Sequence, residues 1–211
     1  LFAVDSAQAA GHFLFNMQAL QVDAMCFTGH KGLLGPSGIG GFVMNEAMNK
    51  ALTPLIAGGT GSMSASLEMP PTLPDRYEAG TPNLPGIMGL GVALRYLMEV
   101  GPDALHKREM ALTNRFLDGL HGNSHIRVPG PVDAKGRVGV ISVDFLRQDN
   151  AEVAFQLEEQ YGILTRCGLH CAPLAHKTLG TYPEGTVRFS VGYTTTEDEV
   201  DTAIQAIHSL S

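Results

Sequence analysis

Residues 27–41 read Phe27-Thr28-Gly29-His30-Lys31-Gly32-Leu33-Leu34-Gly35-Pro36-Ser37-Gly38-Ile39-Gly40-Gly41 and set one lysine among six glycines. A lysine buried between apolar segments is costly in free energy unless it is paired or neutral. Once removed from water, its amine can attack a carbonyl group. Glycines let backbone N–H groups approach a ligand closely, often a phosphate. The stretch is therefore a candidate site of covalent chemistry beside an anion, although an isolated GHKG also fits a surface turn with a solvated lysine.

Polar side chains also follow the first apolar segment of the chain. Residues 1–4 (LFAV) predict a buried parallel strand, with Asp5 and Gln8 at or just past its carboxyl end. Ligands of open α/β sheets gather outside such strand ends, and a buried carboxylate there needs a positive partner. Lys31 follows a later strand of the same sense, while a simple turn cap is the alternative role for Asp5. An aspartate and a lysine that converge beside a glycine-rich loop suggest a pyridoxal phosphate site, with Lys31 as the Schiff-base lysine and Asp5 paired with the pyridinium nitrogen.

Composition narrows the class of protein. The 211 residues are 44% hydrophobic and 17% charged, which allows a substantial core. The net charge of −7, without a basic run, argues against nucleic acid or an anionic membrane as partner, and no apolar run is long enough to span a bilayer. Three cysteines (Cys26, Cys167 and Cys171) form no disulfide framework and suit a reducing, cytoplasmic setting. Cys167 and Cys171 lack a second ligand pair, so no metal site is expected.

Apolar periodicity divides the chain into two regions. Up to residue 86 it predicts strands at 1–4, 24–27 and 40–44, a turn or short helix at 6–11, a short helix at 45–49 and a long Gly/Pro/Ser/Thr-rich loop at 54–86. Helical spacing begins at Ile87 and is interrupted at Gly101-Pro102. Beyond that we expect helices at 103–120, 151–161 and 196–210, the last opened by a Thr196/Glu199 capping box, and strands at 126–128, 138–144 and 186–193. The mixture of strands and helices indicates an α/β or α+β fold for the small domain.

Five motifs resemble one known family. They are VDSAQAAGHF (4–13), FTGHKGLLGPSGIGGF (27–42), EAGTPNLPGIMGLGVAL (78–94), TRCGLHCAPLAH (165–176) and TVRFSVGYTTTEDEVD (186–201). In this order they resemble the class V aminotransferases, and within them the cysteine desulfurases and selenocysteine lyases of the SufS-like branch. The resemblance implies a homodimeric, pyridoxal phosphate-dependent α/β enzyme of fold type I. Residues 1–86 would then be the C-terminal portion of the large, cofactor-binding domain, 87–99 a connecting helix and 100–211 the small C-terminal domain. We expect a piece of a longer protein, because the first strand has no upstream neighbour and the family's upstream phosphate loop and ring-stacking histidine are absent.

The same resemblance assigns roles to individual residues. It implies that Lys31 carries the cofactor, that Asp5 pairs with the pyridinium nitrogen and that Gln8 bonds the phenolic oxygen. The phosphate would be contacted by Thr28, which stands where serine is common, by His30, and by Thr81 from the other subunit. Arg188 would clamp the substrate carboxylate, with Arg166 as a second arginine near the substrate.

Cys171 matches the family's nucleophile, which receives sulfur as a persulfide. His170 and Arg166 could favour its thiolate form by their positive charge. Without the resemblance, Cys171 would be interpreted as a core residue. Cys167 matches no known role, and Cys26 is expected in the core.

The resemblance therefore predicts a cysteine desulfurase that converts L-cysteine to L-alanine and leaves sulfur on Cys171 for a possible acceptor protein. The alternatives are another class V enzyme (a selenocysteine lyase, a C–S lyase or an aminotransferase) or an inactive fragment of one.

Overall fold

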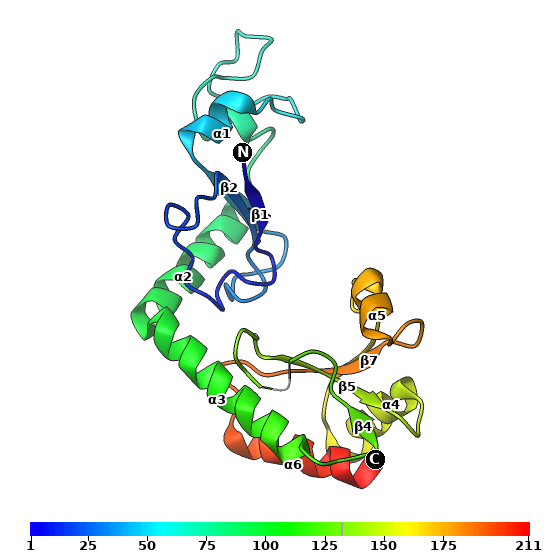
Figure 1. Cartoon of the computed structure of the whole chain (residues 1–211). Helices are drawn as coiled ribbons and strands as arrows, with labels where there is room; N and C mark the ends of the chain where they lie inside the picture. Colours follow the sequence, from blue (N-terminus) through cyan, green and yellow to red (C-terminus); the bar gives the residue numbers. More distant parts are fainter. Residues whose placement is uncertain (132) are drawn as a thin grey trace. The chain divides into compact units, whose positions relative to one another are not determined.

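The computed structural model describes residues 1–131 and 133–211. The chain divides into two compact units, Leu1–Asp103 and Ala104–Ser211 (Figure 1). Both units combine strands and helices, so the predicted α/β class is confirmed. In the described part of the chain, no helix has both the length and the apolar character that a membrane span requires.

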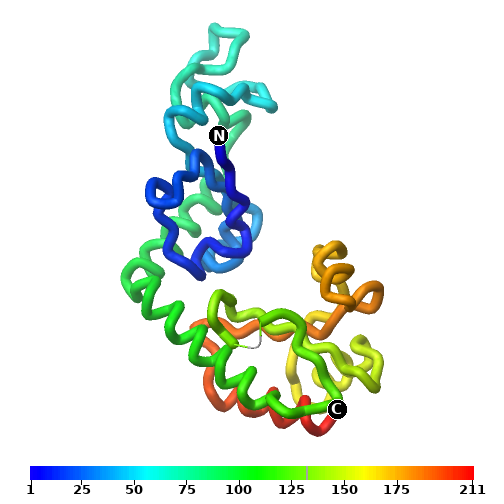
Figure 2. Tube along the Cα trace, in the orientation of Figure 1, coloured from blue at the N-terminus to red at the C-terminus, as the bar shows by residue number. Residues whose placement is uncertain are grey.

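The first unit is built on a sheet of three strands. The strands are β1 (Ala3–Asp5), β2 (Ala24–Thr28) and β3 (Gly40–Met44), in that spatial order. β1 and β2 are parallel, whereas β3 is antiparallel to β2. The helices are α1 (Glu46–Ala51) and α2 (Leu84–Val100), and between them residues 52–83 form a largely irregular trace with one 3-10 turn, η1 (Asp75–Tyr77) (Figure 2). The long loop predicted between the sheet and the helix is thus confirmed.

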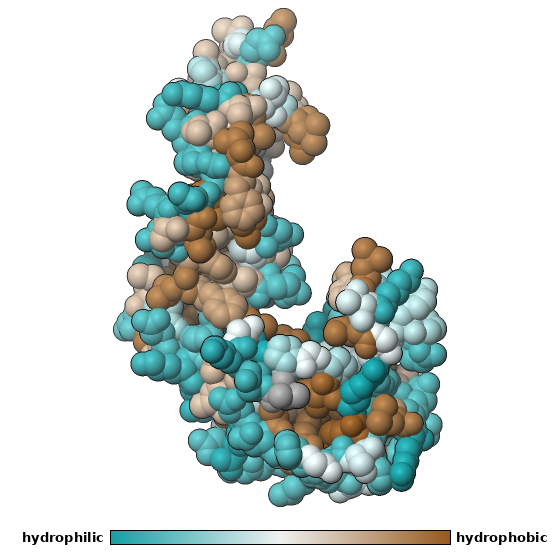
Figure 3. Space-filling view, in the orientation of Figure 1, coloured by the Kyte–Doolittle hydropathy of each residue, from teal (hydrophilic) through white to brown (hydrophobic). Residues whose placement is uncertain are grey.

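The first unit buries few apolar side chains. Its buried apolar residues are Val22, Ala24, Met48, Leu90 and Leu97. Many others are exposed, and Figure 3 shows brown, apolar surface over this unit. The prediction that residues 1–4 form a buried strand is wrong in this respect: Leu1, Phe2 and Ala3 are exposed, because few side chains of the described residues pack over this segment.

The second unit is built on a four-stranded antiparallel sheet. The spatial order is β4 (Ile126–Arg127), β5 (Val140–Phe145), β7 (Thr186–Ser190) and β6 (Arg166–Gly168). Its helices are α3 (Pro102–Leu120), α4 (Asn150–Tyr161), α5 (Pro173–Leu179) and α6 (Glu197–Leu210). One hydrophobic core joins the sheet to α3, α4 and α6, with Phe116, Ile141 and Ile207 among its fully buried members. This core holds the two central strands, β5 and β7, in place.

Most predicted elements of the second unit are confirmed, including the Thr196/Glu199 capping box that opens α6. Two short elements, β6 and α5, were not predicted. The helix expected from Ile87 begins earlier, at Leu84, because Asn83 caps it through the N–H of Gly86 and Pro85 occupies its first turn.

Candidate active site

The first group of candidate residues lies at the carboxyl ends of two neighbouring strands. Asp5 ends β1 and pairs in register with Cys26, two residues before the end of β2 at Thr28. Because the strands are parallel, Asp5 and the lysine turn both lie at the same end of the sheet, where the carboxyl ends of β1 and β2 meet. The Asp5 carboxylate accepts a hydrogen bond of 2.9 Å from the N–H of Ala7, so it does cap the following turn. Capping occupies only part of a carboxylate's capacity to accept hydrogen bonds and leaves it able to meet a cation.

Ser6, which the sequence analysis did not single out, fixes the position of Asp5. It is fully buried, and its hydroxyl donates a 2.7 Å hydrogen bond to the carbonyl of Cys26. Its backbone N–H reaches the same carbonyl at 2.8 Å. The signal in the sequence is a serine directly after a strand, where side-chain hydroxyls commonly bond to nearby backbone.

The turn after Asp5 packs directly against the lysine turn. A Cβ on Gly32 would lie 2.5 Å from the carbonyl oxygen of Ala10 and 2.8 Å from the ring of His12. A Cβ on Gly11, whose φ is +92°, would overlap the carbonyl of Gly32. These two glycines therefore allow a backbone approach that any side chain would prevent. The approach brings the segment after Asp5 next to Lys31.

Lys31 lies on the surface of the structure, contrary to the burial that the apolar surroundings suggested. The physical reason is local: glycines at 29, 32 and 35 carry no side chains that could cover the amine. The alternative interpretation, a surface turn with a solvated lysine, therefore describes the exposure of Lys31 correctly. Beside it, Thr28 Oγ1 and His30 Nδ1 lie 3.2 Å apart, so the two predicted phosphate contacts form one polar pair.

Two further predicted cofactor contacts lie on exposed turns of the same unit. Gln8 is in the turn after β1, and Thr81 is in the bend before α2. Two residues after Thr81, the side chain of Asn83 donates a 3.1 Å hydrogen bond to the carbonyl of Gly38, within the glycine-rich stretch. The start of α2 is thereby tied to the segment that follows Lys31.

The second group of candidates lies in the second unit, where two arginines face each other across neighbouring strands. Arg166 of β6 is the register partner of Arg188 of β7. Like charges directly opposite each other destabilise a sheet. Among the described residues neither guanidinium has a carboxylate ion pair, and Arg188 Nε is buried without a hydrogen-bond partner. A carboxylate ligand would relieve both the repulsion and the unsatisfied donor.

Cys171 lies on the loop that follows β6 and is exposed. A guanidinium nitrogen of Arg166 lies 3.8 Å from its Sγ. Both His170 and Cys171 have positive φ values, +51° and +62°, which non-glycine residues adopt rarely. Such strained backbone is typical of functional loops.

His170 differs from the cation that the sequence suggested. Burial lowers its pKa below the ordinary value of 6.5, and the positive charges of Arg188, His176 and Arg166 lower it further. Because the Nε2 atom lies 2.8 Å from the carbonyl oxygen of Arg166, Nε2 carries the proton in the neutral ring, and Nδ1 can accept one. Arg166 is therefore the permanent positive charge next to Cys171.

The other two cysteines are less suited to nucleophilic chemistry. Burial raises the pKa of the Cys167 thiol, and the nearby charge of Asp149 adds to this effect. A raised pKa leaves less thiolate at neutral pH. Cys26 is exposed rather than in the core, because its face of β2 has little covering it, and its register partner Phe42 is also exposed.

The two groups offer complementary chemistry, each within its own unit. Asp5, Thr28, His30 and Lys31 combine an anion, a polar pair and an amine beside close-packed glycine backbone, which fits a phosphorylated carbonyl cofactor. Arg166, Arg188 and Cys171 combine carboxylate recognition with an exposed thiol.

Cysteine desulfurases are among the known proteins that this chain is similar to. A probable cysteine desulfurase of Pyrococcus abyssi (strain GE5 / Orsay) is 35% identical over 214 residues, which cover 100% of this chain and 52% of the relative. The apo structure of cysteine desulfurase from Thermococcus onnurineus NA1 has a TM-score of 0.88 and 33% identity, and the match covers 100% of this chain and 52% of that one. The cysteine desulfurase CsdA (S-sulfonic acid) from Escherichia coli has a TM-score of 0.84 and 28% identity, with coverage of 98% and 50%. The chain spans about half the length of the curated relatives it matches.

The family model described as Aminotransferase class-V matches residues 1–203. The chain belongs to the class-V aminotransferase family.

Proposed function

We propose that the protein is a pyridoxal phosphate-dependent cysteine desulfurase that converts L-cysteine to L-alanine and receives the sulfur on Cys171. Its similarity to cysteine desulfurases supports the activity. The observation that carries the proposal is the exposed Cys171 thiol, 3.8 Å from the guanidinium of Arg166. Arg166 is the register partner of Arg188, whose buried Nε has no hydrogen-bond partner among the described residues.

The cofactor would be held by the first group of residues. Lys31 would bind its carbonyl carbon, Asp5 would pair with the ring nitrogen and Gln8 would bond the phenolic oxygen. Thr28 and His30 would contact the phosphate. Pyridoxal phosphate supplies an electron sink for the amino acid that it binds. The chain's own contribution is to position that amino acid and to provide the acceptor of its sulfur.

The substrate carboxylate would be bound by Arg188, with Arg166 beside it. A guanidinium presents two parallel N–H groups that match the two oxygens of a carboxylate. Binding there would satisfy the buried Nε of Arg188 and offset the repulsion between the two register partners.

Cys171 would then accept the sulfur. Its thiolate attacks the sulfur of bound cysteine, so a sulfur–sulfur bond forms and the bond between sulfur and Cβ breaks. The electron pair of the broken bond goes to Cβ, which takes a proton and becomes the methyl group of alanine. Because the Cys171 side chain is exposed, the persulfide formed on it would be accessible to an acceptor protein.

We further propose the setting in which this chemistry operates. Three free cysteines fit the reducing cytoplasm. Exposed apolar side chains on α2, including Met88 at 67% and Met98 at 72% exposure, are compatible with a homodimer in which Thr81 reaches the partner's phosphate. We assign residues 1–86 to a large cofactor-binding domain, 87–99 to a connecting helix and 100–211 to a small domain. The division between Asp103 and Ala104 supports the start of the small domain.

The test is product analysis on the purified holoprotein. Wild type and the Cys167→Ser variant should release alanine from L-cysteine, whereas Cys171→Ser should bind the cofactor but release none. Alanine from selenocysteine alone would identify a selenocysteine lyase instead. Full alanine release by Cys171→Ser would contradict the proposed role of this cysteine.

A further inference from the structure

The segment from 169 to 185, which carries Cys171, is not fixed by the hydrophobic core. None of these residues, all of them described, belongs to the core of the second unit. Three of its large apolar side chains, Leu174, Leu179 and Tyr182, are exposed, at 74%, 45% and 48%, and Leu169 is half-buried. Segments with so little apolar burial open easily unless other contacts hold them. Two sets of polar contacts tie this segment to the sheet and to α4.

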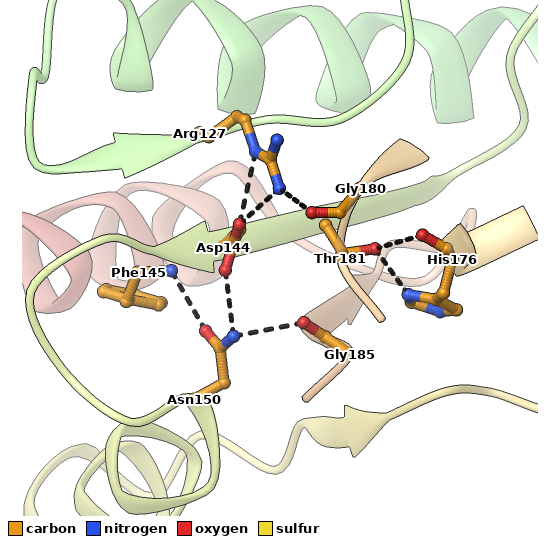
Figure 4. A network of polar contacts seen from close by, with 8 residues as sticks. All are labelled: Arg127, Asp144, Phe145, Asn150, His176, Gly180, Thr181 and Gly185. Carbon is orange, nitrogen blue, oxygen red and sulfur yellow. Dashed lines mark hydrogen bonds and ion pairs between the residues drawn. The ribbon is translucent and has the colours of Figure 1, made fainter. Parts of the chain in front are cut away.

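The first polar contact is made by Arg127 of β4. Its guanidinium donates to Oδ2 of Asp144 on β5, at 3.2 Å from Nε and 2.7 Å from Nη2. The same Nη2 donates a 3.0 Å hydrogen bond to the carbonyl of Gly180, the residue that ends α5 (Figure 4). Arg127 therefore ties the far end of the helix after Cys171 to the edge of the sheet.

The second contact is made by Asn150, whose side chain is buried at the start of α4. Its amide nitrogen donates to Oδ1 of Asp144 at 3.0 Å and to the carbonyl of Gly185 at 3.2 Å. Its amide oxygen accepts a 3.0 Å hydrogen bond from the N–H of Phe145 (Figure 4). The two oxygens of Asp144 thus hold Arg127 and Asn150 at once, and each of these binds one carbonyl of the segment.

Gly185 is in close backbone contact with the strand that precedes Cys171. With a φ of +79° it packs so closely on the backbone of Gly168 that a Cβ would overlap the Gly168 carbonyl. Gly168 is the last residue of β6, three positions before Cys171. The carbonyl that Asn150 holds is therefore in backbone contact with the start of the cysteine loop.

We propose that Arg127, Asp144 and Asn150 form an anchor that positions the loop of Cys171 for sulfur transfer, with Asn150 as its central positioning residue. This inference rests on the proposed desulfurase function. A displacement of about 1 Å at a reacting group can lower a rate by orders of magnitude, so a loosened anchor should slow the step at Cys171. Arg188 lies in the middle of β7 between two paired strands, so cysteine binding should change little.

The experiment compares Asn150→Asp with a matched control in the purified holoprotein. Aspartate keeps the acceptor for Phe145 but loses both donated hydrogen bonds and adds a charge next to Asp144. Asn123→Asp changes an asparagine whose amide also bonds three partners, His208, Ser211 and the N–H of His125, away from the loop. Because Asn150 is buried, its substitution can also affect folding, so a second pair of variants is included. Arg127→Lys removes the guanidinium fork at the anchor. Its control, Arg115→Lys, removes a guanidinium fork that binds Asp201 and joins α3 to α6.

Hydrogen exchange of residues 169–185 and the single-turnover rate of sulfur loading on Cys171 are the two measurements. We expect faster exchange and a loading rate about tenfold lower in both anchor variants, with an unchanged KM for L-cysteine and wild-type behaviour in both controls. Unchanged exchange in both anchor variants would overturn the anchor. Faster exchange with a wild-type loading rate would overturn its positioning role. A wild type that loads no sulfur would contradict the proposed function instead, while the exchange data would still report on the anchor.

Discussion

At the scale of single residues, the chemistry of the cysteine loop depends on which side chains keep their charge. Arg166 and Arg188 are permanent cations in register across β6 and β7. His170 lies among them and is held neutral by burial and by their charges. A neutral imidazole can accept or donate a proton near the thiol, whereas a third cation at this point would increase the repulsion.

The lowered pKa of His170 predicts a pH dependence of stability. Between its pKa in the folded chain and 6.5, the unfolded chain binds more protons, so the free energy of unfolding should fall as pH falls below 6.5. His170→Gln should reduce this dependence, because glutamine does not titrate. Urea unfolding at pH 7.5 and pH 5.5 is the measurement, with exposed His121→Gln as the control. Equal pH dependence in wild type and His170→Gln would contradict the assignment.

Arg188 makes a separate prediction about substrate affinity. Arg188→Ala should raise the KM for L-cysteine by about 10- to 100-fold, as expected when charge-assisted hydrogen bonds to a carboxylate are lost. The KM of Arg188→Lys should lie between those of wild type and Arg188→Ala, because lysine keeps the positive charge but lacks the two parallel N–H groups of the guanidinium. Steady-state kinetics check this, with exposed Arg147→Ala as the control. A KM for Arg188→Ala equal to that of wild type would show that the carboxylate binds elsewhere.

At the scale of elements, long periodic segments could be predicted from the sequence and short ones could not. α3, α4 and α6 carry apolar residues at helical spacing, and each was predicted within a residue or two of its ends. β6 and α5 are three and seven residues long, too short for a periodic pattern, and their placement depends on pairing with β7 and on the anchor. The motif around Cys171 predicted a nucleophile at this position, but not the backbone that presents the side chain.

The same limit applies to the lysine turn. Its glycines predict a close approach of backbone N–H groups to a ligand, which stays a prediction; the structure shows in addition a close backbone contact between Gly32 and Gly11. The sequence left both a buried and an exposed Lys31 open, because the exposure depends on which side chains from other segments cover the amine. Ser6 was missed for a related reason: its bond to Cys26 joins residues twenty positions apart.

The capping box of α6 gives a prediction at this scale. The Thr196 hydroxyl accepts a 3.2 Å hydrogen bond from the N–H of Glu199 at the first turn of a helix that packs on the core. Thr196→Ala should lower the free energy of unfolding by about 1 kcal/mol. Thr194→Ala, at an exposed turn position, should stay within about 0.5 kcal/mol of wild type. Urea unfolding of both variants measures the difference. Equal losses of unfolding free energy in the two variants would contradict the stabilising effect of the cap.

At the scale of the whole molecule, the proposed chemistry is divided between two compact units. Lys31 and Asp5 belong to Leu1–Asp103, whereas Cys171, Arg166 and Arg188 belong to Ala104–Ser211. The proposed functions of the two units should therefore be separable by mutation.

Separability predicts opposite behaviour of two variants. Lys31→Ala should lose the visible absorbance of bound cofactor and its fixation by borohydride, since the covalent lysine is gone. Cys171→Ser should keep both, because it leaves the first unit unchanged. Absorption spectra and peptide mapping after borohydride are the measurements. Labelling of a lysine other than Lys31 in wild type would contradict the cofactor assignment.

The most direct test of the central claim is the mass of the peptide that contains Cys171 after brief exposure of the holoprotein to L-cysteine. We expect a gain of one sulfur atom on Cys171, reversed by a thiol reductant, and no gain on Cys26 or Cys167. Sulfur found on Cys167, or no sulfur on any cysteine while alanine accumulates, would contradict it.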